Sequence, residues 1–222
     1  MRAMLIANAA DADAGFVGER LRELGYVFTA CQREHPESWP PLDGHDLVLM
    51  LGSEWSVYWS DVRPAVLAES AVVRGAVAAG VPMIGICFGS QLVAHALGGS
   101  VSRAATPEIG WYEVDSDVPQ AIACGPWMQW HADVVVIPPA ATELARSMAG
   151  PQAWQIGRGL CTQFHPEATE AVVARWAALG AKTLAEIGTS PDELMAATRA
   201  NVAVSAANAV RLVDWFCEHV AR

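Results

Sequence analysis

The stretch that decides the fold is Pro82-Met83-Ile84-Gly85-Ile86-Cys87-Phe88-Gly89-Ser90-Gln91. An apolar, strand-like run stops at Gly85, a cysteine follows two residues later, and Gly89 lies two residues beyond that cysteine. The segment from Gln91 to Leu97 then has the pattern of a helix. Gly-x-Cys-x-Gly between a strand and a helix predicts a nucleophile elbow, a turn too tight for a Cβ at the flanking positions. We therefore expect the sulfur of Cys87 to project from the end of a strand.

A cysteine in an elbow is chemically activated. The turn places Cys87 at a helix N-terminus, whose partial positive charge favours the thiolate, and thiolates attack carbonyl carbon atoms. A lone cysteine in an apolar strand is more often a packing residue, but packing does not require the two flanking glycines. The motif alone leaves the reaction open, because a dienelactone-hydrolase type of enzyme could present a similar elbow.

The composition excludes several classes of function. The 222 residues suit a single domain over residues 1–222. A net charge of −10 with one lysine, Lys182, disfavours nucleic-acid partners and excludes a G-x-x-x-x-G-K-[ST] phosphate loop. No apolar stretch reaches the length of a membrane span, and the apolar start of the chain is too short for a signal peptide. The 5 scattered cysteines form no C-x-x-C pair, which argues against a metal site or a disulfide framework and predicts a cytoplasmic protein.

Apolar runs rich in β-branched residues alternate with helical patterns in the N-terminal half. Strands are expected at Ala3–Ala7, Val27–Ala30, Leu47–Leu51 and Met83–Ile86, and helices near Ala14–Leu24, Ala65–Ala79 and Gln91–Leu97. This alternation predicts an α/β fold with a doubly wound, mostly parallel sheet.

The pattern changes to short strands separated by Pro and Gly, which predict an antiparallel extension of the sheet. These strands are expected at Trp111–Val114, Asp133–Ile137, Glu143–Met148, Ala153–Ile156 and Cys161–Phe164. Residues 168–222 form a helical C-terminal part, where Ser190 before Pro191 predicts a helix start.

A second constellation is Leu160-Cys161-Thr162-Gln163-Phe164-His165-Pro166-Glu167. A short β-rich run ends at His165, and a proline and a carboxylate follow. Catalytic groups in open α/β sheets gather outside the carboxyl ends of strands, so one crevice is expected to hold Cys87 and His165. His165 would take the thiol proton and later protonate a leaving amine, while Glu167 would accept the other ring N–H.

Three other residues compete for these roles. His95 lies inside the helix after the elbow, and Glu170 is more simply a helix-face charge. His131 precedes a strand instead of ending one, so we expect it at the wall of the substrate pocket.

Acyl transfer also requires hydrogen-bond donors for the developing oxyanion. The backbone amide of Phe88, directly after the nucleophile, is one candidate. The apolar run Leu47–Leu51 breaks at Gly52, whose amide is the second. We hypothesise that Trp55, Tyr58 or Trp59, which follow this break, walls the entrance and selects the leaving group.

Together these segments resemble the class I glutamine amidotransferases, whose fingerprint is Gly-x-Cys-x-Gly-x-Gln followed later by His-Pro-Glu. The stretches Glu108–Trp111 and Trp130–Asp133 look most like the GMP-synthetase glutaminase branch. The resemblance implies a flavodoxin-like fold with Cys87 carrying a γ-glutamyl thioester and His165 and Glu167 completing the triad.

The resemblance also implies that Gln91 and His131 contact substrate and that Gly52 and Phe88 form the oxyanion hole. It implies no metal and no organic cofactor, a glutamine or γ-glutamyl substrate, and a separate synthase that receives ammonia. A γ-glutamyl peptidase with the same triad is the alternative, and a non-enzymatic binding module is a third hypothesis.

The chain departs from the family pattern in three places. Ser90 replaces a larger residue, and the Gly-Gly-Pro oxyanion loop reads Gly52-Ser53-Glu54. No ATP-pyrophosphatase segment follows Glu167, so we do not expect a complete two-domain GMP synthetase.

Overall fold

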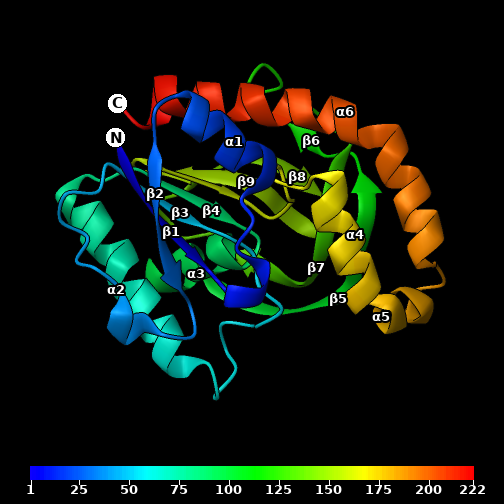
Figure 1. The fold of residues 1–222 in the computed structure, drawn as a ribbon, viewed down its shortest axis with the longest axis horizontal. Coiled ribbons are helices and arrows are strands. Elements are labelled where there is room, and N and C mark those ends of the chain that lie inside the picture. The colour runs from blue at the N-terminus through cyan, green and yellow to red at the C-terminus, as the bar shows by residue number, and fades with distance from the viewer.

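The computed structural model describes residues 1–222, and an eight-stranded sheet crosses its centre in the order β2-β1-β3-β4-β10-β9-β8-β6 (Figure 1). The strands are β1 (Arg2–Ala7), β2 (Val27–Gln32), β3 (Leu47–Met50), β4 (Met83–Ile86), β6 (Asp115–Ser116), β8 (Thr142–Ser147), β9 (Gly150–Ile156) and β10 (Gly159–Thr162). Strands β1 to β4 and β10 pair in parallel, while β9, β8 and β6 pair antiparallel. The mostly parallel sheet with an antiparallel extension is thereby confirmed.

Helices cover both faces of the sheet. One layer holds α1 and α6, which pack on each other, and the other holds α2 and α3 (Figure 1). These helices are α1 (Gly15–Glu23), α2 (Arg63–Ala79), α3 (Phe88–Ala96) and α6 (Pro191–Trp215). In β1, Ala3 and Leu5 join the core under α1 and α6, whereas Met4 and Ile6 join the core under α2 and α3. Burial on both faces explains why the central strands read as continuous apolar runs.

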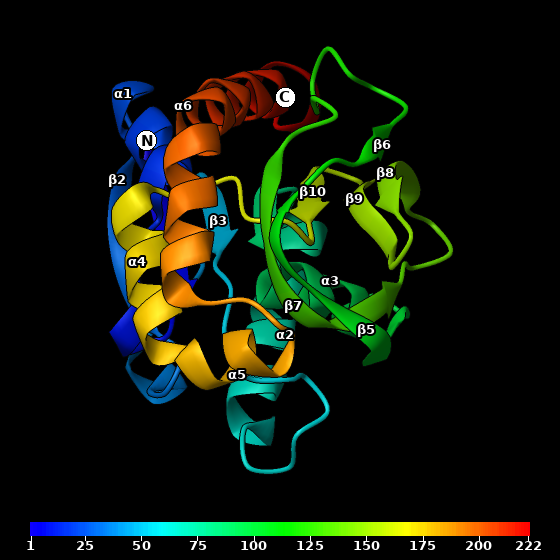
Figure 2. The same cartoon turned by 90° about the vertical axis from the view of Figure 1, so that its right-hand side faces the viewer.

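A separate two-stranded ribbon is the main departure from the predicted fold. Its strands are β5 (Ser100–Tyr112) and β7 (Trp127–Val136), which curve away from the sheet in Figure 2. The predicted segments at 111–114 and 133–137 cover only parts of it. Only one residue of β5, Ile109, is buried, and the register of the strand shifts between Arg103 and Glu108, so the sequence lacks the alternation of a half-buried strand. The ribbon contacts the turn after β10, where the amide of His165 donates to the Met128 carbonyl at 2.8 Å.

The C-terminal part is helical, as predicted. It comprises α4 (Glu170–Leu179), α5 (Ala181–Glu186), α6 and a terminal π-helical segment, Phe216–Val220. The predicted start of α6 is confirmed, because Oγ of Ser190 accepts the amide of Glu193 at 3.2 Å. Two short 3-10 segments, η1 (Ala9–Asp11) and η2 (Pro36–Ser38), follow β1 and β2.

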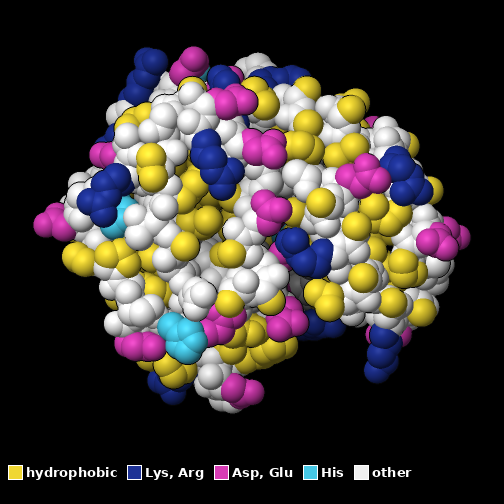
Figure 3. All heavy atoms as spheres, viewed as in Figure 1, with side chains coloured by type: hydrophobic (Ala, Val, Ile, Leu, Met, Phe, Trp, Pro, Cys, Tyr) yellow, Lys and Arg dark blue, Asp and Glu magenta, His cyan; other side chains and the backbone are white.

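The surface carries charges of both signs. On the face shown in Figure 3, basic and acidic side chains are interspersed and do not gather in a single large patch. No helix combines the length and the apolar character that crossing a membrane requires.

Candidate active site

Cys87 occupies a strained turn between β4 and α3. Its backbone has φ 50° and ψ −106°, and it is the only residue other than glycine with a positive φ. The flanking glycines make this turn possible. A methyl group on Gly85 would lie 2.9 Å from the carbonyl oxygen of Gly89, and one on Gly89 would collide with the carbonyl of Met50. Backbone strain of this kind is concentrated at functional sites, and the turn presents the sulfur at the N-terminus of α3.

His165 and Glu167 lie in the turn after β10 and form a buried pair. Nδ1 of His165 lies 2.7 Å from Oε1 of Glu167, and Nε2 of His165 has no hydrogen-bond partner. Burial lowers the pKa of the imidazole, but electrostatic interactions with Glu167 and Cys87 outweigh burial and raise that pKa well above its ordinary value. The imidazole therefore retains a proton readily and leaves Nε2 free to exchange it.

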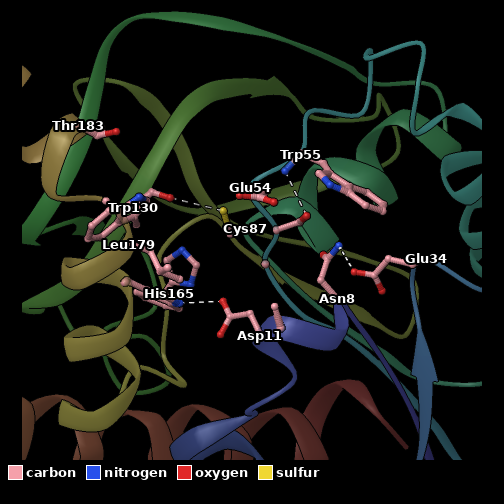
Figure 4. Close-up of a pocket in the computed structure, with 15 residues that line it drawn as sticks. Asn8, Asp11, Glu34, Glu54, Trp55, Cys87, Trp130, His165, Leu179 and Thr183 are labelled. Atoms are coloured by element: carbon pink, nitrogen blue, oxygen red, sulfur yellow. Dashed lines mark hydrogen bonds between the residues drawn. The ribbon is translucent and has the colours of Figure 1, made fainter.

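One cavity of about 430 Å³ brings the two constellations together (Figure 4). Its walls are formed by Asn8, Ala10, Asp11, Glu34, Gly52, Ser53, Glu54, Trp55, Cys87, Trp130, His165, Trp176, Leu179, Gly180 and Thr183. The cavity opens beyond the carboxyl ends of β1, β2, β3, β4 and β10, where an open α/β sheet places its ligands. Helices α4 and α5 and strand β7 close its other side.

Gly52 lies close to both Cys87 and the imidazole of His165. A methyl group placed on Gly52 would lie 3.0 Å from Cε1 of His165 and 3.6 Å from Cβ of Cys87. The amide of Gly52 donates to no backbone or side-chain acceptor of the protein. Phe88 is the first residue of α3, where amides have no acceptor within the helix. Two amides next to the sulfur are thus free to donate to a negatively charged oxygen.

Gln91 and His131 lie outside the walls of the cavity. Gln91 is buried in α3, and its Nε2 contacts Oε1 of Gln163 at 3.3 Å. His131 is buried in β7, with Nε2 3.1 Å from Oε2 of Glu108 and Nδ1 3.0 Å from the carbonyl oxygen of Asp133. Both side chains are engaged with protein groups in this structure.

Of the aromatic residues expected at the entrance, Trp55 alone lines the cavity. The hydroxyl of Tyr58 donates to Oδ1 of Asp133 at 2.9 Å, and Trp59 is 44% exposed. Sequence reasoning missed Trp176, whose ring contacts the imidazole of His165 edge-on at 4.6 Å between centroids. Nothing local in the sequence indicates this contact, because it forms only when α4 packs back against the turn that carries His165.

The cavity is acidic. Asp11, Glu34 and Glu54 line it, and no Lys or Arg does. Arg175, which does not line the cavity, forms an ion pair with Asp11, with 2.5 Å between Nη2 and Oδ1. Burial raises the pKa of Glu34, but hydrogen bonds to its carboxylate from its own backbone, from Asn8 and from the Ala9 amide outweigh burial and lower that pKa. Glu34 is therefore ionised. No three His, Cys, Asp or Glu side chains gather at the spacing of a metal site.

Comparisons with known proteins identify the family. A model described as glutamine amidotransferase class-I matches residues 19–173. A GMP synthase of Bdellovibrio bacteriovorus is 29% identical over 174 residues, which cover 75% of this chain and 32% of that protein. A glutamine-hydrolysing GMP synthase subunit from Saccharolobus solfataricus is 38% identical over 96 residues, covering 39% of this chain and 51% of its own length. The chain therefore matches only about a third of the first relative's length and half of the second's.

The solved structures agree. A glutamine amidotransferase from Thermotoga maritima superposes with a TM-score of 0.86 at 25% identity, covering 98% of both chains. A second, from Methylobacillus flagellatus, has a TM-score of 0.85 at 22% identity, covers 99% of this chain and 94% of that one, and supports the fold. The chain belongs to the class I glutamine amidotransferase family.

Proposed function

We propose that this protein hydrolyses the γ-amide of glutamine through a γ-glutamyl thioester on Cys87. His165 is the proton carrier and Glu167 orients it. The observation that carries the proposal is the shared cavity, in which a strained cysteine borders an imidazole whose Nδ1 is bound by a buried carboxylate.

The proposed reaction has two half-reactions. Sγ of Cys87 attacks the γ-carbonyl carbon, and the carbonyl electron pair moves to oxygen, where the amides of Gly52 and Phe88 receive it. His165 then donates its Nε2 proton to the nitrogen, the C–N bond breaks, and ammonia leaves. Water enters, gives a proton to His165 and attacks the thioester carbon, which releases glutamate and the Cys87 thiolate. Glu167 holds the ring and stabilises its cationic form in both halves.

The acidic cavity favours glutamine over γ-glutamyl peptides. Both substrates share the γ-glutamyl half, so they differ only in the leaving group. Ammonia carries no negative charge, whereas the amino acid released from a γ-glutamyl dipeptide carries a carboxylate. That carboxylate would enter a cavity lined by Glu34 and Glu54, and like charges repel each other. The γ-glutamyl peptidase is therefore the second candidate.

We further propose that ammonia passes to a separate synthase. The relatives named above are GMP synthases, one of them a single subunit of such an enzyme, and this chain matches only part of their length. The relative that is a single subunit supports a partner that carries the acceptor chemistry.

A glutamine-analogue chloroketone tests the nucleophile. We expect the wild type and Cys124→Ser to be labelled once, and Cys87→Ser to lose the label; Cys124 is the matched control because its thiol is exposed. Labelling that persists in Cys87→Ser would refute Cys87 as the nucleophile.

Turnover of the isolated chain tests the substrate. We expect release of ammonia from glutamine to exceed cleavage of γ-glutamylglycine in kcat/KM. Faster cleavage of the dipeptide would favour the peptidase instead. Absence of both turnover and labelling would favour the binding module.

A further inference from the structure

Arg33 is a buried cation to which the reaction steps above assign no role. It lies just after β2, and its side chain is fully buried at 0% exposure. A buried guanidinium is tolerated only when its charge is paired and its N–H groups have acceptors. Its acceptors therefore show what the protein uses it for.

All five N–H groups of Arg33 have acceptors. Nε and Nη2 contact the two carboxylate oxygens of Glu69 at 2.9 and 3.1 Å, and Nη1 donates to Oδ1 of Asn8 at 2.7 Å. The remaining three bonds go to backbone carbonyl oxygens. Nη2 donates to Leu51 at 2.9 Å and to Ile6 at a longer 3.4 Å, and Nη1 donates to Gly52, the residue after Leu51, at 3.0 Å. Arg33 thus clamps the turn that carries one of the two proposed oxyanion donors.

The clamp fixes the direction of the Gly52 amide. The carbonyl of Leu51 and the N–H of Gly52 belong to one planar trans peptide group, in which they point in opposite directions. When the carbonyl points at Arg33, the N–H must point away from it. Gly52 lines the cavity and Arg33 does not, so the free side of this peptide faces the cavity. A cationic donor on the carbonyl also polarises the peptide and strengthens its N–H as a donor.

Arg33 also contacts the residue that carries the second amide. Its Cζ lies 4.6 Å from the centroid of the Phe88 ring, within the range of a cation–π interaction. One side chain therefore contacts both residues whose amides are proposed to receive the oxyanion.

We propose that Arg33 is a positioning residue for the oxyanion hole. It holds the Gly52 amide toward the cavity, and it reaches no substrate atom itself. The inference deepens the proposed function, and it requires only that the Cys87 thiolate be acylated through a tetrahedral oxyanion.

Two reagents distinguish an effect on oxyanion stabilisation from an effect on the reactivity of the thiolate. In acylation by p-nitrophenyl acetate, Sγ attacks a carbonyl, an oxyanion forms, and p-nitrophenolate leaves with the electron pair of the broken C–O bond. In alkylation by iodoacetamide, Sγ displaces iodide from a methylene carbon and no oxyanion forms. The ratio of the two rate constants at Cys87 therefore reports on the oxyanion hole and cancels changes in thiolate content.

Arg33→Lys keeps the positive charge opposite Glu69 but cannot reproduce the planar fork that reaches two carbonyls. We expect acylation to slow by roughly 10- to 100-fold, which is at most the rate loss of about 10²- to 10³-fold that removal of one oxyanion donor causes. Alkylation should stay within roughly twofold of the wild-type rate. Arg20→Lys is the matched control, because Arg20 binds Asp214 on α6 in the same two-pronged way outside the cavity. We expect it to leave the ratio unchanged.

A double variant covers the case in which Arg33→Lys fails to fold. Arg33→Met with Glu69→Leu removes both buried charges, an exchange that proteins often tolerate. It should fold, alkylate normally and acylate slowly. An unchanged ratio in either folded variant would overturn the inference. If wild-type Cys87 shows no γ-glutamyl turnover but the ratio falls as expected, the proposed function fails and the role of Arg33 stands.

Discussion

Gly52→Ala tests the spacing of the active site most directly. Gly52 does not have a positive φ, so alanine fits the backbone, and the substitution keeps the amide that is proposed to donate to the oxyanion. The new methyl group would lie 3.0 Å from Cε1 of His165. Optimal carbon–carbon contacts lie at about 3.5–4.0 Å, so the ring must withdraw by roughly 0.5–1 Å. The substitution thus changes the position of the imidazole and little else.

The magnitude follows from that displacement. A misplacement of about 1 Å costs on the order of 10²-fold in rate, so we expect kcat/KM for glutamine to fall by about 10- to 100-fold. This loss corresponds to about 1.4–2.7 kcal/mol of transition-state stabilisation. The initial rate of glutamate release, measured at glutamine concentrations well below KM, gives the ratio of the variant's kcat/KM to that of the wild type.

Gly75→Ala is the matched control. Gly75 lies in α2, where an added methyl would make an ordinary 3.5 Å contact with Cδ2 of Leu42. In a helix interior, Gly→Ala stabilises by up to about 1 kcal/mol, so this variant should be fully active and slightly more stable. Full activity of Gly52→Ala, with an unchanged melting temperature, would refute the placement of His165 against Gly52.

Three further predictions concern the cavity. Glu167→Gln removes a negative charge that raises the pKa of His165, so the imidazolium should be lost at lower pH and the alkaline limb of activity should move down; an unmoved limb would contradict the pairing. Trp55→Ala should change the ranking of γ-glutamyl substrates, whereas Trp59→Ala, outside the cavity walls, should not. Glu54→Gln should raise kcat/KM for γ-glutamylglycine relative to glutamine by roughly two- to fivefold, because a surface charge interaction is worth about 0.5–1 kcal/mol.

The sequence by itself determined the parts whose geometry is local. The glycines at 85 and 89 predict the elbow because a side chain at either would strike a neighbouring backbone, and the structure has that turn. Alternating apolar strands and helices predict the parallel sheet, since each strand is buried on both faces. The segment ending at His165 could be assigned to a strand end next to Cys87 because carboxyl ends of parallel strands meet at one edge.

Only the tertiary structure decided what surrounds the two motifs. The site includes residues from segments that lie far from Cys87 in the chain, namely Arg33, Glu34 and Trp176. No local spacing therefore relates them to Cys87. Most of strand β5 was missed for a similar reason, because β5 is held by pairing with β7 and its sequence lacks a strand pattern of its own. Short-range backbone constraints are encoded within a few residues, whereas cavity charge, hydrogen-bond clamps and ring contacts arise only when separate elements pack.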